Sequence, residues 1–252
     1  MTTVRDFVNG PSYSDPDREA LCRRVAAAFV EIADDAIAAR GRFIAALTGG
    51  RTARTLHRLL AHSYQDSSIW NRTHLFWGDE RCVPPNHPQS NYAEAFTDLI
   101  SEVKVPQDNV HRIEGEVRPP EEAARRYERV LRQFGLNRAA VAENRFDLVC
   151  LSVGADGHIA SLFPGSSALR EASLDAVAVE APPNAEPRER VTMTLPVING
   201  ARCVLVMASG ADKAPIVRKL AAGGQDAADL PAALVKPSGE LRWFFDHAAV
   251  AG

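Results

Sequence analysis

The sequence lacks long apolar runs and an excess of one charge. Its 252 residues carry 29 Lys and Arg against 32 Asp and Glu, a formal net charge of -3. Nucleic acids and acidic membranes select basic surfaces, so neither is an expected partner. No apolar run approaches the roughly 20 residues of a spanning helix, and residues 1–19 lack the basic start and apolar core of a signal peptide. These absences favour a cytoplasmic protein.

Cysteine is scarce and scattered. The four cysteines, Cys22, Cys82, Cys150 and Cys203, form no CxxC pair and have no His at the spacing of a zinc site. Cys150 and Cys203 lie inside apolar runs, where cysteine usually acts as a small buried hydrophobe. The pattern predicts free thiols in a reducing compartment and no zinc site, and we expect no cofactor.

What the sequence does contain is an alternation of helical and strand patterns. A helical periodicity follows Ser14 and Asp15, the expected cap, and ends near Gly41. Further helices are predicted around Leu56 to Leu60, over 92–100, before Gly135 and over 211–222. Short apolar runs predict strands at 42–47, 73–78, 146–154, 190–195, 202–209 and 241–246, with 146–154 near the centre. The alternation predicts an α/β fold in one domain, residues 1–252: a doubly wound, largely parallel sheet with helices on both faces.

Ligands of such sheets bind where loops leave the carboxyl ends of the strands. After the first run, Gly49 and Gly50 open a helix and could cradle a phosphate with backbone N–H groups, or merely supply unusual turn angles. Lys213 follows another strand and could reach the phosphate as a point charge. Most lysines, however, simply lie on a helix surface.

Asp79, Glu80 and Arg81 directly follow the strand at 73–78 and begin a long proline-containing loop. Two acids and an arginine there could orient a polar substrate or clamp its phosphate. They could equally form a local ion pair on a solvated loop.

The most specific segment is GADGHIASLFPG at 154–165, where Asp156 and His158 follow a strand. Histidine exchanges protons near neutrality and Asp156 could orient it, so the pair is a candidate general base. The alternative is a loop histidine that caps a turn. No GxSxG, HExxH, GxGxxG or Walker lysine appears at the strand ends. A non-covalent, metal-free reaction on a phosphorylated small molecule is the remaining simple interpretation.

These segments resemble, in order, the signatures of the 6-phosphogluconolactonases, within the larger group that includes glucosamine-6-phosphate deaminases. The similarity covers most of the chain from Leu47 to His247, and GADGHIASLFPG followed by RVTMTLPVIN is its most specific part. It implies hydrolysis of 6-phospho-D-glucono-1,5-lactone to 6-phosphogluconate, a step of the oxidative pentose phosphate pathway. The partner is then a small phosphorylated lactone, and both a monomer and a small homo-oligomer stay open.

By that resemblance, His158 is the base that activates water, with Asp156 beside it. The phosphate-binding set is Gly49, Gly50, Arg81 and Lys213. Arg51 stands where the family commonly has a small hydroxyl residue, and it either adds a phosphate contact or points to solvent. We also expect backbone N–H groups of Gly154 to Gly157 to stabilise the oxyanion that forms on the lactone.

Two alternatives are kept. Glucosamine-6-phosphate deaminases continue the motif as DGHIAFNEP, with a glutamate that assists ring opening; Phe163 takes that position here, and Arg81 replaces the aromatic residue of their DEY segment. A non-catalytic sugar-phosphate-binding module is the other alternative. Retention of Asp156 and His158 argues against it, because a pure binder needs no proton acceptor.

Overall fold

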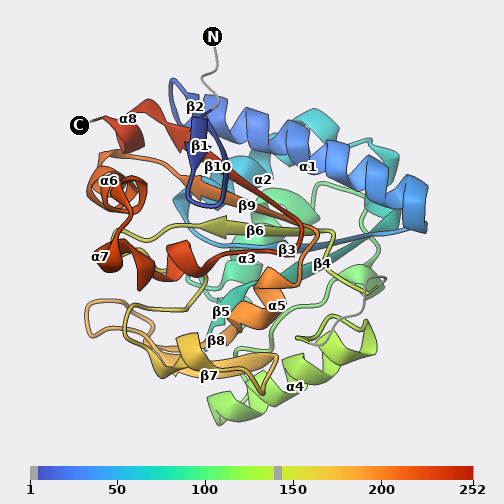
Figure 1. Ribbon diagram of the computed structural model, residues 1–252. Coiled ribbons are helices and arrows are strands. Elements are labelled where there is room, and N and C mark those ends of the chain that lie inside the picture. The colour runs from blue at the N-terminus through green and yellow to red at the C-terminus, as the bar shows by residue number, and fades with distance from the viewer. Residues whose placement is uncertain (1–4, 139–143, 252) are drawn as a thin grey trace.

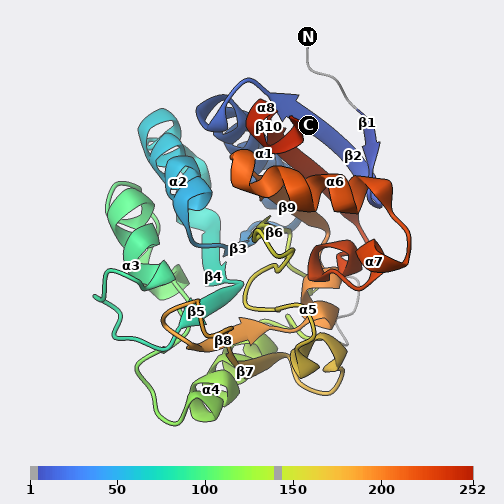
Figure 2. The same cartoon turned by 90° about the vertical axis from the view of Figure 1, so that its left-hand side faces the viewer.

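The computed structural model describes residues 5–138 and 144–251 and has an α/β architecture (Figures 1 and 2). Within these residues the main sheet has seven strands in the order β1-β2-β10-β9-β6-β3-β4. Neighbouring strands are parallel except for the antiparallel pair β1–β2. The strands are β1 (Arg5–Phe7), β2 (Gly10–Asp15), β3 (Phe43–Leu47), β4 (Thr73–Trp77), β6 (Leu148–Ser152), β9 (Cys203–Ala208) and β10 (Glu240–Asp246). The predicted, largely parallel sheet is confirmed.

Helices cover both faces of this sheet. α1 (Arg18–Arg40) and α2 (Arg51–Tyr64) connect strands that step one way across it, whereas α6 (Ala214–Ala222) connects β9 to β10 in the opposite direction. Right-handed crossovers therefore place α6 on the other face from α1 and α2. Figure 1 shows α1 above the strands, and α5 (Leu195–Asn199) and α7 (Gln225–Ala228) below them. This double winding confirms the predicted fold class; the single domain over residues 1–252 stays a prediction.

The remaining helical segments are short apart from α4. They are η1 (Ser68–Arg72), α3 (Asn91–Ala95), the π-helical η2 (Phe96–Ile100), η3 (Gln107–Asn109), α4 (Pro120–Gln133), η4 (Ser167–Arg170), η5 (Ala211–Lys213), η6 (Pro231–Leu234) and α8 (His247–Val250). Gly135 has φ 72 just beyond α4, the left-handed helix stop that the sequence predicts.

A second, antiparallel sheet corrects the prediction in two places. It consists of β5 (Asp79–Arg81), β8 (Glu189–Met193) and β7 (Ala176–Glu180), in the order β5-β8-β7. The run at 190–195 is a strand as predicted, but it belongs to this sheet and not to the main one. Residues 79–81 are a strand and not the start of a loop. A strand of three residues is too short to show an alternation, so the sequence alone gives no sign of β5.

The start of α1 also differs from the prediction. Asp17 is the N-cap, with its side chain accepting a backbone N–H of the first turn at 2.8 Å. Asp15 instead ends β2, where its carboxylate accepts two hydrogen bonds from Arg24 at 2.8 and 2.9 Å. The predicted helix end at Gly41 is confirmed by φ 74 at that glycine.

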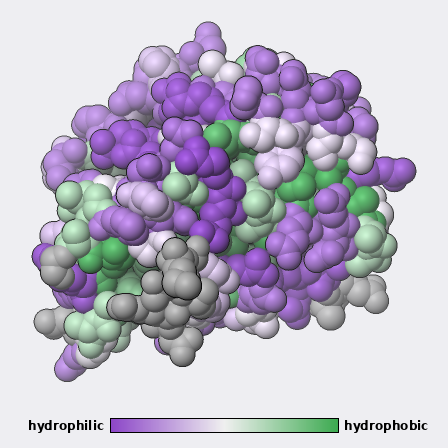
Figure 3. All heavy atoms as spheres, turned by 90° about the horizontal axis from the view of Figure 1, so that it is seen from above, coloured by the Kyte–Doolittle hydropathy of each residue, from purple (hydrophilic) through white to green (hydrophobic). Residues whose placement is uncertain are grey.

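The interior matches the apolar pattern of the sequence. β6 lies between β9 and β3, with Leu148 to Leu151 buried. All four cysteines are free thiols as predicted, and all four are buried, not only Cys150 and Cys203; burial raises the pKa of Cys22 to about 12. On the face seen from above, hydrophilic residues cover most of the surface (Figure 3). Among the described residues, no helix is both long and apolar enough to cross a membrane.

One buried histidine makes stability depend on pH. His57 on α2 is 1% exposed, and its Nδ1 has no hydrogen-bond partner in the described part of the chain. Burial disfavours the imidazolium and lowers the pKa of His57 to about 4. In the unfolded chain the ordinary value of 6.5 applies, so between pH 6.5 and 4 the unfolded state binds more protons. Stability is therefore lost as the pH falls through this window, by roughly 3 kcal/mol for this group.

We expect the free energy of unfolding, measured with urea at several pH values from about 7.5 to about 4, to fall less in His57→Leu than in the unchanged protein. His62→Ala alters an exposed histidine of the same helix and should keep the full decrease. An equal decrease in His57→Leu would exclude His57 as a source of the acid sensitivity.

Candidate active site

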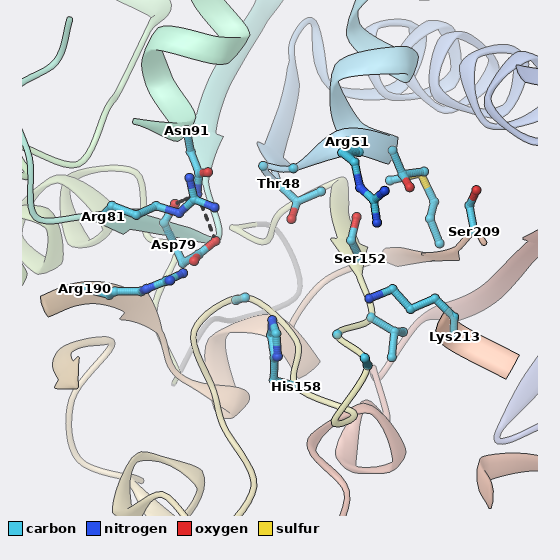
Figure 4. Close-up of a pocket in the computed structure, with 18 of the residues that line it drawn as sticks. Thr48, Arg51, Asp79, Arg81, Asn91, Ser152, His158, Arg190, Ser209 and Lys213 are labelled. Atoms are coloured by element: carbon cyan, nitrogen blue, oxygen red, sulfur yellow. Dashed lines mark hydrogen bonds between the residues drawn. The ribbon is translucent and has the colours of Figure 1, made fainter. Parts of the chain in front are cut away.

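A pocket of about 210 Å³ lies at the carboxyl ends of the main-sheet strands (Figure 4). Its lining residues come from the carboxyl ends of β3, β6 and β9 and the loops that follow them, from β5 and β8, and from the starts of α1, α2 and α3. They include Arg18, Gly49, Gly50, Arg51, Asp79, Arg81, Asn91, Ser152, Gly154, His158, Arg190, Ser209 and Lys213. The structure thus brings all the predicted strand-end segments to one place.

The His158 ring projects into this pocket (Figure 4), and its Nδ1 contacts the carboxylate of Asp156. The His158 Nδ1 and Asp156 Oδ1 atoms are 2.6 Å apart, and the same oxygen accepts the backbone N–H of His158 at 3.1 Å. Burial raises the pKa of Asp156, but the hydrogen bond and charge of His158 outweigh it, so this pKa lies below its ordinary value. An ionised Asp156 can only accept, which places the proton on Nδ1 and leaves the Nε2 lone pair free for chemistry.

Two glycines allow this histidine loop to form. Gly157 has φ 87, a left-handed conformation that side chains disfavour. At Gly154, a Cβ would lie 2.1 Å from His158 Nδ1, so the imidazole packs directly on the bare Cα. In the Gly-x-Asp-Gly-His segment, the first glycine therefore leaves room for the imidazole ring and the second allows the turn.

Two of the loop amides expected to stabilise the oxyanion already have partners. The N–H of Gly154 donates to the carbonyl of His158 at 2.8 Å, and the N–H of Gly157 donates to the carbonyl of Gly154 at 3.0 Å. Both amides are used inside the loop and do not face the pocket as donors. Ala155, between them, lines the pocket, so oxyanion stabilisation by the remaining loop amides stays a prediction.

One end of the pocket suits a phosphate. α2 begins at Arg51 with no acidic residue in its first turn and no side-chain cap from the described residues, so its first N–H groups are open to an anion. Gly50 precedes it with φ 93, but its own N–H donates to Glu94 Oε2 at 3.1 Å. Lys213 Nζ and Arg51 Nη2 lie 3.4 and 3.7 Å from the same carboxylate, that of Asp212. Arg51 and Lys213 therefore stand together beside the helix start.

Sequence reasoning missed Arg18 at this end. Its Nε donates to Ser209 Oγ at 3.1 Å, and Ser209 Oγ donates to Asp246 Oδ2 at 2.6 Å. Arg18 reaches the pocket because β2 pairs with β10 and thereby brings the start of α1 beside the end of β9. This position depends on strand pairing between distant segments, so no local sequence motif could predict that Arg18 lines the pocket.

The other wall carries Asp79, Arg81 and Arg190, and Figure 4 places them across the pocket from Arg51 and Lys213. The structure therefore does not bring Arg81 to the helix start where Arg51 and Lys213 meet. Its phosphate role stays a prediction.

Glu80 has a structural position. It does not line the pocket: its carboxylate accepts hydrogen bonds from Ser90 Oγ and from the backbone N–H groups of Arg81, Asn91 and Tyr92. Burial raises the pKa of Glu80, which these four donors oppose. The side chain ties β5, which carries Arg81, to the start of α3.

Within residues 5–138 and 144–251, no three His, Cys, Asp or Glu side chains lie together as a metal site would require. A positively charged helix start, an oriented imidazole and a second cationic wall meet in one small pocket at the strand ends. These features define an α/β enzyme site for a small phosphorylated molecule.

The chain belongs to the family described as glucosamine-6-phosphate isomerases/6-phosphogluconolactonase, whose pattern matches residues 16–243. It is 36% identical over 237 residues to a 6-phosphogluconolactonase of Nostoc sp., covering 94% of this chain and 95% of that protein. A solved 6-phosphogluconolactonase from Trypanosoma cruzi superposes with a TM-score of 0.86 at 25% identity, over 97% of each chain. A monomeric glucosamine-6-phosphate deaminase has a TM-score of 0.78 at 21% identity, over 94% of this chain and 98% of that one, and so shares the fold.

Proposed function

We propose that this protein hydrolyses 6-phospho-D-glucono-1,5-lactone to 6-phosphogluconate. The observation that carries the proposal is the Asp156–His158 pair, 2.6 Å apart, facing a pocket whose far end holds the open start of α2 and Lys213. The similarity to 6-phosphogluconolactonases over nearly the whole chain supports the same reaction. The step belongs to the oxidative pentose phosphate pathway.

In the proposed reaction, water attacks C1 of the lactone and passes one proton to His158 Nε2. Asp156 stabilises the imidazolium that forms. The C1–O5 bond of the tetrahedral intermediate then breaks, and the protonated His158 returns the proton to O5 as it leaves. The product is a carboxylic acid at C1 and a hydroxyl at C5; the acid then releases the second proton of the water to solvent and becomes the carboxylate, and the histidine is regenerated.

The phosphate is proposed to bind at the start of α2, between the Gly49–Gly50 turn, Arg51 and Lys213. An anion there meets open N–H groups and two cations. Asp212 balances Arg51 and Lys213 in the described structure, and a phosphate dianion would take over that role. Arg51, which the sequence left between two roles, is proposed to contact the phosphate.

Lys213→Ala should raise KM for the phosphorylated lactone by roughly 10- to 100-fold, the effect of losing a charge-assisted hydrogen bond. kcat should change little, because the phosphate is held alike in ground and transition states. Unphosphorylated glucono-1,5-lactone is the matched substrate, and its kinetics should be unaffected. A similar loss with both lactones would contradict a phosphate role for Lys213.

The function itself is tested by a coupled assay. Glucose-6-phosphate dehydrogenase forms the δ-lactone in place, and acid release is followed with and without the protein. Release no faster than the spontaneous rate would refute the proposal. Ammonia release from glucosamine 6-phosphate tests the deaminase alternative. It is not expected, because the Phe163 ring, whose centroid is 4.9 Å from that of His158, occupies the place of the deaminase glutamate.

We further propose that the protein acts in the cytoplasm, a reducing compartment that suits four buried free thiols. Its proposed partner is the small phosphosugar lactone alone. A metal-free reaction and a monomeric or small homo-oligomeric state stay predictions.

A further inference from the structure

Two arginines face each other across the strands of the small sheet. In the antiparallel pairing of β5 with β8, Arg81 is directly opposite Arg190. Like charges in this register destabilise a sheet. Both side chains line the pocket (Figure 4), so the repulsion is concentrated where a ligand binds. An anion bound between or beside the two guanidinium groups would offset this repulsion.

Arg190 in particular lacks a charged partner. The residue is 8% exposed, yet no carboxylate in the described part of the chain lies within 4 Å of its guanidinium. Its Nε donates to the carbonyl of Pro187 at 3.0 Å, and its Cζ lies 5.8 Å from the Phe163 ring centroid. Burial lowers the pKa of Arg190, the expected cost of desolvating a cation.

The nearby acid is already occupied by neutral donors. Asp79 Oδ2 accepts from Ser161 Oγ at 2.6 Å, and its Oδ1 accepts from Asn91 Nδ2 at 3.3 Å. Arg81 donates through Nη1 to the carbonyl of Gln89 at 2.6 Å, while its buried Nε has no partner among the described residues. The two guanidinium groups thus keep donors that the surrounding protein does not use.

This wall is also next to the reacting atoms. Phe163 contacts both Arg190 and His158, so the guanidinium and the imidazole border the same aromatic ring. The phosphate end, with Arg51 and Lys213, lies across the pocket. A bound phosphosugar that spans the pocket therefore presents its C1 end, not its phosphate, to Arg190.

Resting on the proposed function, we propose that Arg190, with Arg81 beside it, forms a second anion subsite for the oxygen atoms on C1. It stabilises the charge that develops there during water attack, and it then holds the carboxylate of the product. This assignment supplies the stabilising donors that the loop amides of Gly154 and Gly157 cannot supply, because both are hydrogen-bonded within the loop. It also gives Arg81 a role other than phosphate binding.

The test uses two ligands that differ only at C1. 6-Phosphogluconate carries a carboxylate there, and D-glucitol 6-phosphate carries a hydroxymethyl group on the same chain. Their dissociation constants are measured by isothermal titration calorimetry. The unchanged protein should bind 6-phosphogluconate at least about 10-fold more tightly, the effect of a charge-assisted hydrogen bond.

In Arg190→Gln this preference should fall to about one, with the affinity for D-glucitol 6-phosphate unchanged. Arg190→Lys keeps the charge but loses the planar guanidinium, so it should retain part of the preference for 6-phosphogluconate. This variant replaces Arg190→Gln in the test if Arg190→Gln does not fold. Lys213→Ala should weaken both ligands equally. Arg188→Gln, which alters a partly buried arginine paired with Glu180 near the same strand, should change neither affinity.

An equal loss for both ligands in the Arg190 variants, or no loss for either, would overturn the carboxylate subsite. Equal affinities of the unchanged protein for the two ligands would overturn it as well. These outcomes are separate from the proposed function: lactone hydrolysis without discrimination at C1 refutes the subsite alone. Absence of hydrolysis in the coupled assay refutes the function, whatever the ligands show.

Discussion

Replacing His158 by alanine is expected to lower kcat for the phosphorylated lactone by about 100- to 10,000-fold, the usual contribution of a positioned general base. The water molecule must lose a proton as it attacks C1, and His158 Nε2 is the acceptor that the Asp156 contact leaves free. KM should change little, because the imidazole acts on the transition state more than on the bound substrate. Steady-state kinetics in the coupled assay measures both constants.

The matched control is His62→Ala, an exposed histidine at the end of α2. It should leave kcat and KM unchanged. If His158→Ala kept full kcat, His158 would have no part in the proton transfer. Because the His158 side chain lies in the pocket and is partly exposed, the substitution should lower the free energy of unfolding only slightly, and thermal unfolding tests this.

Gly154→Ala should lower kcat by at least about 100-fold without any change in the reacting groups themselves. A Cβ on residue 154 would lie 2.1 Å from Nδ1 and 2.2 Å from Cε1 of His158, and 2.7 Å from Asp156 Oδ1. The ring and the carboxylate cannot both keep their places. A displacement of about 1 Å is enough to cost two orders of magnitude in an aligned site.

Gly78→Ala is the control, since this glycine lies between β4 and β5 near the same pocket. Its added Cβ would meet its nearest neighbours at 3.6 to 3.9 Å, ordinary contact distances. Activity should therefore be retained. A fully active Gly154→Ala enzyme would show that the ring position described above is not the one that reacts.

Contiguous motifs could be predicted from the sequence because their residues act within one turn. The Asp156–Gly157–His158 segment and the Gly49–Gly50 turn each follow a recognisable apolar strand, and parallel strand ends must meet at one edge. The strands that precede these segments were also predicted, because their apolar runs are long enough to be recognised as strands.

On the far wall, Asp79 and Arg81 were candidates from the sequence, but Arg190 was not, because its position depends on pairing between distant segments. Arg190 reaches the pocket only because β8 leaves the main sheet and pairs with β5. The hydrogen bonds that occupy the amides of Gly154 and Gly157 depend on how the loop closes. Neither the pairing of β8 with β5 nor the closure of the loop produces a periodic pattern in the sequence. A polar residue within a strand pattern, such as Arg190, is therefore expected to face solvent.

The pocket is divided between two sheets that supply different parts of it. The main sheet supplies the helix start that is proposed to anchor the phosphate, and the loop that carries His158. The positions at which this sequence departs from the deaminase pattern, Arg81 and Phe163, both border Arg190 on the other side. A change of reaction within this fold therefore needs only a few substitutions around Arg190. The seven-stranded sheet and the proposed phosphate site at the start of α2 need not change.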